Sequence, residues 1–283
     1  MTKTLLSIGH GYSAQALEAR LLAQGWRIIG TTRSPDRARA MRARGVEPLI
    51  WPGTPLPLAQ ATHLLTSVAP LRDDPVLSAQ SDQIAAARHL DWVGYLSTIG
   101  VYGDHQGGWV DEETPANANS DRAIARVRAE AAWQTLCDEA GLRLHVFRLA
   151  GIYGPGRGPF EKLREGRAQM VIKDGQVFSR IHQADIGQAL EAAIHSDIGS
   201  RIFNLCDDAP APPQDVLRFA AALLGIAPPP EVPFAQADLS PMARSFYADS
   251  KRVRNDRIKG ELRLSLIYPD YQTGLAAILR DEG

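Results

Sequence analysis

Residues 7–14 read Ser7-Ile8-Gly9-His10-Gly11-Tyr12-Ser13-Ala14 and directly follow the apolar run Thr4-Leu5-Leu6. Three leucines then share one face of an amphipathic pattern, which predicts a helix over about residues 14–24 that ends at Gly25. The next apolar segment, residues 27–31, predicts a second strand. The sequence therefore predicts a strand, a glycine-rich turn, a helix and a strand in succession.

The turn has the pattern Gly-x-Gly-x-x-Ala, which is typical of dinucleotide-binding sites. Gly9 allows a tight turn, Gly11 has no side chain to block a pyrophosphate, and Ala14 lets the helix pack closely on the strand. The helix N-terminus offers unpaired N–H groups to phosphate, and His10 is expected to face solvent or the phosphates. The alternative is an ordinary strand–turn–helix unit without a ligand.

The end of the second strand favours NADP as the cofactor. A site that prefers NAD usually has an acidic residue there for the ribose hydroxyl, whereas this chain reads Thr31-Thr32-Arg33-Ser34. Arg33 can pair with a ribose phosphate, and Thr32 and Ser34 can donate hydrogen bonds to it. Alternatively, Ser34 only caps the helix that begins at Pro35 and Arg33 is solvated; the two interpretations are compatible.

Length and composition limit the class of protein. The 283 residues suffice for a large α/β domain or for two lobes, and the net charge of −1 gives no general attraction to nucleic acid or acidic membranes. Cys137 and Cys206 show neither metal-ligand spacing nor a disulfide framework, and we expect no metal site. No signal peptide or apolar run of membrane-spanning length is evident, so we expect a cytoplasmic protein that binds neither membrane nor nucleic acid.

Short apolar strands alternate with helices along the first half of the chain, and the second half is less regular. This alternation predicts an α/β fold, a Rossmann doubly wound parallel sheet with a smaller C-terminal substrate lobe. Asp174-Gly175, between two short apolar segments, predicts a hairpin. The strands are expected at residues 4–6, 27–31, 46–51, 63–68, 92–98, 144–149 and 201–205, and further helices at 37–44, 81–89, 120–140 and 184–195.

The two lobes are expected to interleave, since no clear linker separates them. We expect an NADP-binding domain over residues 1–155, to which residues 180–206 return. Residues 156–179 and 207–283 would then form the small substrate-binding lobe, with the ligand over the C-terminal strand ends.

Four ordered motifs carry a family resemblance: Gly9–Ala14, Ser97–Gly103, Arg148–Arg157 and Arg180–Asp185. They resemble the extended short-chain dehydrogenase/reductase family, which includes nucleotide-sugar epimerases and dehydratases, in its atypical branch with a Gly-x-Gly-x-x-Ala turn. The resemblance covers about residues 3–207. It implies a nicotinamide cofactor and oxidoreductase or epimerase/dehydratase chemistry on a small substrate that is sugar-nucleotide-like or otherwise anionic. A homodimer is possible.

The family's catalytic set is a Ser or Thr, a Tyr and a Lys, which orient the substrate and pass a proton. Thr98 matches the hydroxyl residue. Aligned on Glu130, which matches the family's helix glutamate, the Tyr and Lys positions are Arg122 and Arg126. An arginine cannot act as the general acid or base because its guanidinium stays protonated.

Three interpretations remain open. The chain is an enzyme with Tyr102 beside Thr98 as an alternative proton donor, and with Arg122 and Arg126 in the catalytic site, where they suit an anionic substrate. Alternatively, it binds NADP without redox chemistry as a sensor or scaffold, which is compatible with the third interpretation. In the third, Arg122 and Arg126 only form a solvated helix face, with an Arg126–Glu130 ion pair.

The cofactor-contacting residues expected from the turn, the second strand and the resemblance lie at five places in the chain. They are Gly9, Gly11, Tyr12, Ser13, Ala14, Thr32, Arg33, Ser34, Ser67, Val68, Ala69, Gly151 and Ile152.

Overall fold

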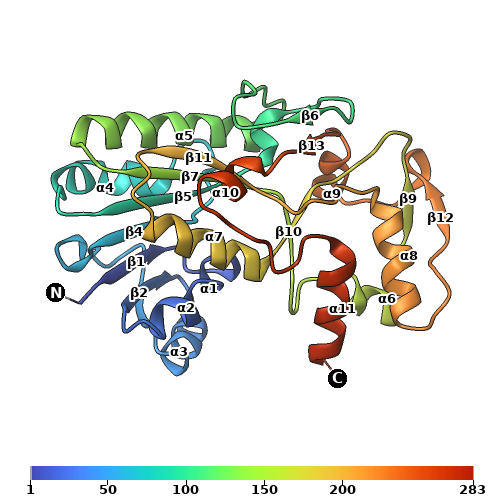
Figure 1. Cartoon of the computed structure of the whole chain (residues 1–283), viewed down its shortest axis with the longest axis horizontal. Coiled ribbons are helices and arrows are strands. Elements are labelled where there is room, and N and C mark those ends of the chain that lie inside the picture. Colours follow the sequence, from blue (N-terminus) through green and yellow to red (C-terminus); the bar gives the residue numbers. More distant parts are fainter. Residues whose placement is uncertain (1, 283) are drawn as a thin grey trace.

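A seven-stranded, wholly parallel sheet forms the centre of the protein (Figure 1) in the computed structural model, which describes residues 2–282. Its strand order is β11-β7-β5-β4-β1-β2-β3. The strands are β1 (Thr4–Ile8), β2 (Arg27–Thr32), β3 (Glu47–Ile50), β4 (His63–Thr66), β5 (Trp92–Thr98), β7 (Leu144–Leu149) and β11 (Arg201–Leu205). Strands β2 and β3 are added on one side of β1, and β4 and the later strands on the other side. Folds of this type bind ligands at this switch point in strand order, between β1 and β4.

Helices cover both faces of the sheet. They are α1 (Tyr12–Gln15), α2 (Glu18–Leu22), α3 (Pro35–Ala43) and α7 (Gln183–His195) on one face, and α4 (Pro75–Ala86) and α5 (Asp121–Ala140) on the other (Figure 1). Ser34, Asp74 and Ser120 cap α3, α4 and α5 through their side-chain oxygens. Gly141 ends α5 with a left-handed φ of 69°.

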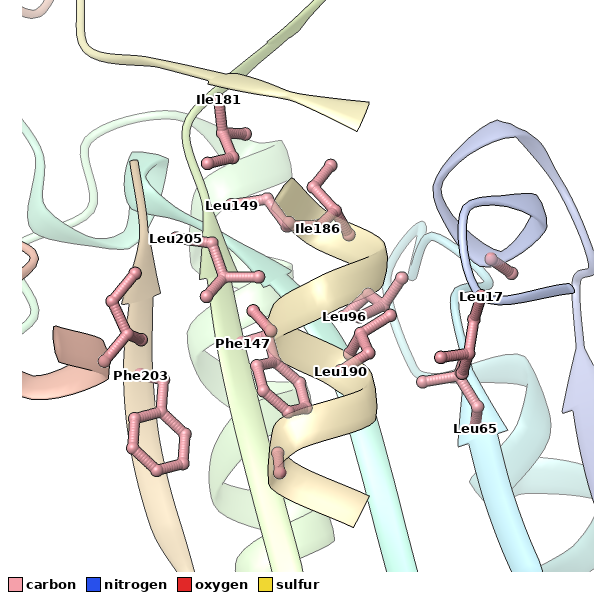
Figure 2. Packing of buried hydrophobic residues seen from close by; sticks show 14 of the residues in the cluster. Leu17, Leu65, Leu96, Phe147, Leu149, Ile181, Ile186, Leu190, Phe203 and Leu205 are labelled. Atoms are coloured by element: carbon pink, nitrogen blue, oxygen red, sulfur yellow. The ribbon is translucent and has the colours of Figure 1, made fainter. Parts of the chain in front are cut away.

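The sheet's two faces bury separate apolar clusters. Figure 2 shows the α7 side, where Ile186 and Leu190 pack over Phe147 and Leu149 of β7. On the opposite face Trp133 of α5 lies in the second cluster. Such burial of large side chains is the main favourable contribution to stability.

Most of the remaining elements lie beyond one end of the sheet, whereas the short helix α10 (Asp256–Gly260) packs beside β11 (Figure 1). A third apolar cluster among them includes Phe160, Leu163, Val216, Tyr271 and Leu275. The elements are β6 (Trp109–Val110), β8 (Gly151–Tyr153), α6 (Phe160–Arg164), β9 (Met170–Ile172), β10 (Arg180–His182), α8 (Pro213–Leu223), β12 (Glu231–Pro233), α9 (Pro241–Phe246), β13 (Arg252–Val253), α10 (Asp256–Gly260) and α11 (Tyr271–Glu282). Three short helices of the 3-10 type complete the set, at Leu58–Gln60, Ile99–Tyr102 and Phe234–Gln236.

The prediction of a doubly wound parallel sheet is confirmed, and all seven expected strands lie in it. Three local predictions are wrong. The helix expected at 14–24 is two short helices, α1 and α2. The helix expected at 81–89 begins earlier, at Pro75, and ends at Ala86. The hairpin around Asp174-Gly175 does not form, because β9 pairs in parallel with β12 and β10 pairs with β8.

No helix within residues 2–282 is both long enough and apolar enough to cross a membrane.

Candidate functional site

The glycine turn lies at the switch point between β1 and β4. Gly9 has a φ of +75°, and a Cβ on it would lie 2.8 Å from Val68 Cγ2. Thr31 Oγ1 accepts a hydrogen bond from the Gly9 N–H at 2.8 Å, and the Ser67 hydroxyl donates to the Gly9 carbonyl. Only glycine fits here, because both the backbone conformation and the approach of β4 exclude a side chain.

Neither the backbone conformation nor neighbouring atoms require glycine at position 11. A Cβ on Gly11 would meet only the Gly9 carbonyl oxygen, at 3.7 Å, and its φ of −108° is open to any residue. The space beside Gly11 is therefore empty of protein atoms, as the approach of a pyrophosphate requires. Next to it, the Tyr12 hydroxyl donates to the Pro155 carbonyl at 3.0 Å, and Ser13 is half-buried.

The helix after the turn packs tightly against both the sheet and helix α7. Ala14 is buried, and a Cβ on Gly187 of α7 would lie 2.2 Å from the Ala16 carbonyl oxygen. The Gln183 amide also donates to the Tyr12 carbonyl at 2.6 Å. Residues 180–195 thus support the glycine turn from a distance of about 170 positions in the sequence.

His10 does not face solvent or phosphate, so this prediction is wrong. His10 is 5% exposed, and its ring nitrogens Nδ1 and Nε2 lie 2.8 Å from Ser7 Oγ and 2.6 Å from Glu18 Oε1. Glu18 also accepts from Arg44 at 2.7 Å. Gly30 of β2 makes room for the ring, because a Cβ there would lie 2.9 Å from His10 Cγ. The side chain braces the turn from behind.

The end of β2 leaves one cationic side chain in the open. Arg33 is exposed, whereas Thr32 and Ser34 are half-buried. Ser34 accepts from the Arg37 N–H at 3.3 Å as the cap of α3, and its own N–H donates to Thr32 Oγ1 at 3.2 Å. The capping role of Ser34 is thus present, and it leaves the Arg33 side chain available for an anion.

The other expected cofactor residues lie at the carboxyl ends of two further strands. Ser67 and Val68 directly follow β4 and are half-buried, and Ala69 is exposed. Gly151 and Ile152 follow β7 in the short strand β8; Gly151 is exposed and Ile152 half-buried. Parallel strands end at one edge of the sheet, so both segments share the edge that carries the glycine turn.

Thr98 and Tyr102 belong to one short turn but point to different surroundings. Thr98 Oγ1 accepts from the Gly100 N–H at 3.1 Å, so its own proton is available to a substrate oxygen. Tyr102 is 0% exposed, and its hydroxyl donates to Asn204 Oδ1 at 2.7 Å. Burial raises the pKa of Tyr102 to about 12. This geometry argues against Tyr102 as the proton donor.

Arg122 and Arg126, at the relay positions, differ from each other. Arg122 is exposed, and its guanidinium carbon lies 5.0 Å from the Phe246 ring centre. Arg126 Nη1 donates to the Leu96 carbonyl at 2.7 Å and to the Tyr95 hydroxyl at 3.0 Å. Arg126 thus ties α5 to β5 instead of reaching outward.

The expected ion pair between Arg126 and Glu130 is not formed. Glu130 is buried and instead accepts from Arg148 Nη2 at 2.8 Å and from the Ser97 hydroxyl at 2.5 Å. Ser97 and Arg148 are opposite each other in the register of β5 and β7. The Arg148 guanidinium also lies 4.8 Å from the Tyr102 ring centre. The helix glutamate therefore belongs to a sealed polar cluster under the strand ends.

Sequence reasoning gave no role to Arg148 or to Arg180. Arg180 begins β10 directly opposite Gly151 of β8, at the edge where the expected cofactor residues lie. Both arginines stand within motifs that carry the family resemblance, and their position there was the available signal.

Comparison with known proteins identifies the family. The sequence model of the NAD dependent epimerase/dehydratase family matches residues 78–192. Protein YeeZ of Escherichia coli is 30% identical over 290 residues, which cover 95% of this chain and 97% of that protein. The chain belongs to this epimerase/dehydratase family. A second relative in the comparison, the 3-diazoavenalumate denitrifying reductase of a Streptomyces species, is 27% identical over 75% of this chain and 77% of its own length.

Solved structures agree with this family assignment. A functionally unknown conserved protein from Silicibacter pomeroyi is 57% identical and superimposes with a TM-score of 0.95, covering 99% of both chains. The dTDP-glucose 4,6-dehydratase from Bacillus anthracis, solved with NAD, has a TM-score of 0.79 at 16% identity over 99% of this chain and 96% of that chain. A human epimerase family protein, solved with NADPH, has a TM-score of 0.75 at 18% identity, over 98% and 99% of the two chains. The last two likenesses concern the fold. Together with the family match, the turn geometry makes this an NAD(P)-binding protein of the epimerase/dehydratase class.

Proposed function

We propose that this chain binds NADPH and reduces a small anionic substrate by hydride transfer, without the tyrosine–lysine relay of its family. The observation that carries the proposal is the contrast within the turn. Gly9 is enclosed by β4, whereas the space beside Gly11 is open to a pyrophosphate.

A preference for NADPH over NADH is supported by the end of β2. Arg33 is exposed there, with Thr32 and Ser34 beside it and no acidic residue in the segment. A guanidinium can hold a ribose phosphate with paired, charge-assisted hydrogen bonds.

Cofactor binding and substrate binding are assigned to different parts of the chain. We propose that the cofactor lies on residues 1–155 and 180–206, and that residues 156–179 and 207–283 bind the substrate. In support, β11 completes the central sheet, whereas β9 and β12 pair only with each other.

Reduction is favoured over epimerisation or dehydration because of the missing base. Oxidising an alcohol requires a group that removes the hydroxyl proton, and neither Arg122 nor Arg126 can do so. The Tyr102 hydroxyl is occupied by Asn204. A reduction needs only a hydride and a proton that water can supply, while the Thr98 hydroxyl donates to the substrate oxygen. One relative carries the name of a reductase.

The test uses para-carboxybenzaldehyde as an anionic, electron-poor probe. We expect the wild-type protein to consume NADPH and form para-(hydroxymethyl)benzoate, and the Gly11→Ala variant to form it about 10- to 100-fold more slowly at limiting NADPH. Failure of the wild-type protein to form the alcohol at NADPH concentrations that saturate its binding would contradict the proposal.

The second candidate is an NADPH-binding sensor without catalysis. It is favoured by Arg126, whose side chain donates hydrogen bonds to the Leu96 carbonyl and the Tyr95 hydroxyl within the protein. Tight NADPH binding without turnover of carbonyl, imine or conjugated-alkene probes would support the sensor.

A further inference from the structure

Arg180 lies where the two proposed halves of the site meet. In the parallel pairing of β10 with β8, Arg180 is opposite Gly151. A Cβ on Gly151 would lie 3.8 Å from Arg180 Cγ, so the arginine stem passes directly over this glycine. Gly151 is one of the expected cofactor residues, and we take it to lie at the nicotinamide end of the cofactor. The Arg180 side chain therefore starts beside the expected hydride.

Backbone carbonyls accept hydrogen bonds from one of the three nitrogens of the Arg180 guanidinium. Its Nη1 donates to the Phe178 carbonyl at 2.9 Å and to the Ala211 carbonyl at 3.2 Å. Within residues 2–282, Nε and Nη2 have no acceptor, and no carboxylate oxygen lies within 4.0 Å of the guanidinium. Neither nitrogen is among the fully buried, unpartnered atoms, so each keeps some accessible surface. Two adjacent donors are thus held in place without a partner.

The charge on Arg180 has no counter-charge at neutral pH. Burial lowers the pKa of Arg180, yet a guanidinium remains protonated. The acid that influences it most is Asp207, which is 1% exposed, and burial raises the pKa of Asp207 to about 8. Asp207 is therefore mostly neutral at pH 7. A largely desolvated cation without a counter-ion costs free energy, and an anionic ligand would offset that cost.

Several aromatic residues lie near this unpaired arginine. The Tyr271 ring centre lies 6.0 Å from the guanidinium carbon. The Phe178 and Tyr247 rings meet edge to face at 5.4 Å, and Tyr247 stacks on Phe234 at 5.2 Å. Arg180 affects the pKa of both Tyr247 and Tyr271, so these phenols are near its charge. Such surroundings favour a flat ring over a hydrated sugar.

We propose that Arg180 binds the carboxylate of an aromatic acid, through Nε and Nη2, and so positions the substrate's reducible carbon at the nicotinamide. Two parallel N–H donors match the two oxygens of a carboxylate. The assignment deepens the proposed function and rests on it, since it takes the nicotinamide to lie at Gly151. It names the substrate class as aromatic carboxylates and excludes sugar nucleotides.

The test is a calorimetric titration of the purified full chain with para-hydroxycinnamate, both with and without saturating NADPH. Its methyl ester is the neutral counterpart, and UDP-glucose is the sugar-nucleotide probe. The variants are Arg180→Gln and Arg180→Lys, with Arg218→Gln as the control, because Arg218 is an exposed arginine of the same lobe that already pairs with Asp215 and Glu231. Direct NADPH titration of each variant measures the cofactor site separately.

We expect the acid to bind wild-type protein at least about tenfold more tightly than the ester, since hydrogen bonds to charged groups contribute that much. Arg180→Gln should abolish this preference, Arg180→Lys should restore part of it, and Arg218→Gln should leave it unchanged. Equal binding of acid and ester to wild-type protein would overturn the proposal without any variant. So would an acid preference that survives in Arg180→Gln, or tighter binding of UDP-glucose than of the acid. Arg180-dependent acid binding without NADPH binding would overturn the proposed function and keep the carboxylate site.

Discussion

The glycine turn and the cluster around Arg148 lie at the same edge of the sheet, yet they are built in opposite ways. At the turn, Gly11 leaves space that no protein atom fills. Around Arg148, Glu130 accepts hydrogen bonds from Arg148 and Ser97 and the Tyr102 ring covers the guanidinium, while Arg148 Nη1 is buried without a hydrogen-bond partner. The difference shows that polar residues close to a site need not act in it: an open backbone points to a ligand, and a buried, closely packed ion pair points to stability.

Replacing Glu130 is expected to be the most destabilising of these substitutions, and it tests whether the buried cluster around Arg148 stabilises the fold. Replacing Glu130 with Gln leaves the Arg148 charge buried without its partner, which should lower the free energy of unfolding by about 3–5 kcal/mol. Urea unfolding measures this, with Glu139→Gln on the exposed face of α5 as the control. A loss below about 1 kcal/mol would mean that the cluster is not the structural support described here.

Asp207 extends the comparison to the lobe junction. Its pKa is raised by burial from 3.8 to about 8, so between these values the folded protein holds a proton that the unfolded chain releases. Stability should therefore fall as pH rises from about 4 to about 8, by roughly 5 kcal/mol from this group. Asp207→Asn should remove that part of the pH dependence in urea unfolding, leaving the variant more stable than wild type at pH 8. Identical pH profiles of variant and wild type would contradict the burial of an ionisable Asp207; Asp215→Asn, at an exposed position, is the control.

The Gly11→Ala substitution tests whether the free space beside Gly11 serves cofactor binding. The added methyl group meets only the Gly9 carbonyl oxygen, so folding should be little affected, while the pyrophosphate loses its approach. We expect NADPH affinity to fall by about 10- to 100-fold, since close backbone hydrogen bonds to a charged group are lost.

The measurement is a fluorescence titration with NADPH. Gly158→Ala is the control, because a Cβ there contacts nothing within 4 Å. Unchanged NADPH affinity in Gly11→Ala would separate the turn from cofactor binding.

The smallest expected effect is that of Tyr102→Phe. The variant loses the hydrogen bond from the Tyr102 hydroxyl to Asn204, which should cost about 1 kcal/mol of unfolding free energy. The rate of NADPH oxidation with a substrate should stay within about twofold of wild type, because the phenol is not the proton donor. A fall of 100-fold or more at intact stability would restore Tyr102 to the catalytic set.

The sequence predicted the sheet well because each strand is a short apolar segment between clear breaks. The turn around Gly9 and the cap at Ser34 are local signals, and they too could be predicted. The hairpin failed because a local Asp-Gly signal competed with partners far along the chain: β9 pairs with β12, some 60 residues later. No local pattern encodes such pairing.

Side-chain partners were the harder part. The four-residue spacing of Arg126 and Glu130 suggests a surface pair, but Glu130 faces the strand ends and meets Arg148 there. Likewise His10 turns inward because Gly30, on the next strand, leaves room for its ring. Both outcomes depend on which strands become neighbours. The unpaired state of Arg180 could not be seen from the sequence for the same reason.

The central claim is that this chain binds NADPH through the glycine turn and Arg33. The most direct test is a calorimetric titration of the wild-type protein with NADPH and, separately, with NADH. The account predicts that NADPH binds at least about tenfold more tightly, and that Arg33→Ala reduces NADPH affinity to that of NADH, which itself does not change. Equal affinities in the wild-type protein, or binding of neither nucleotide, would contradict it.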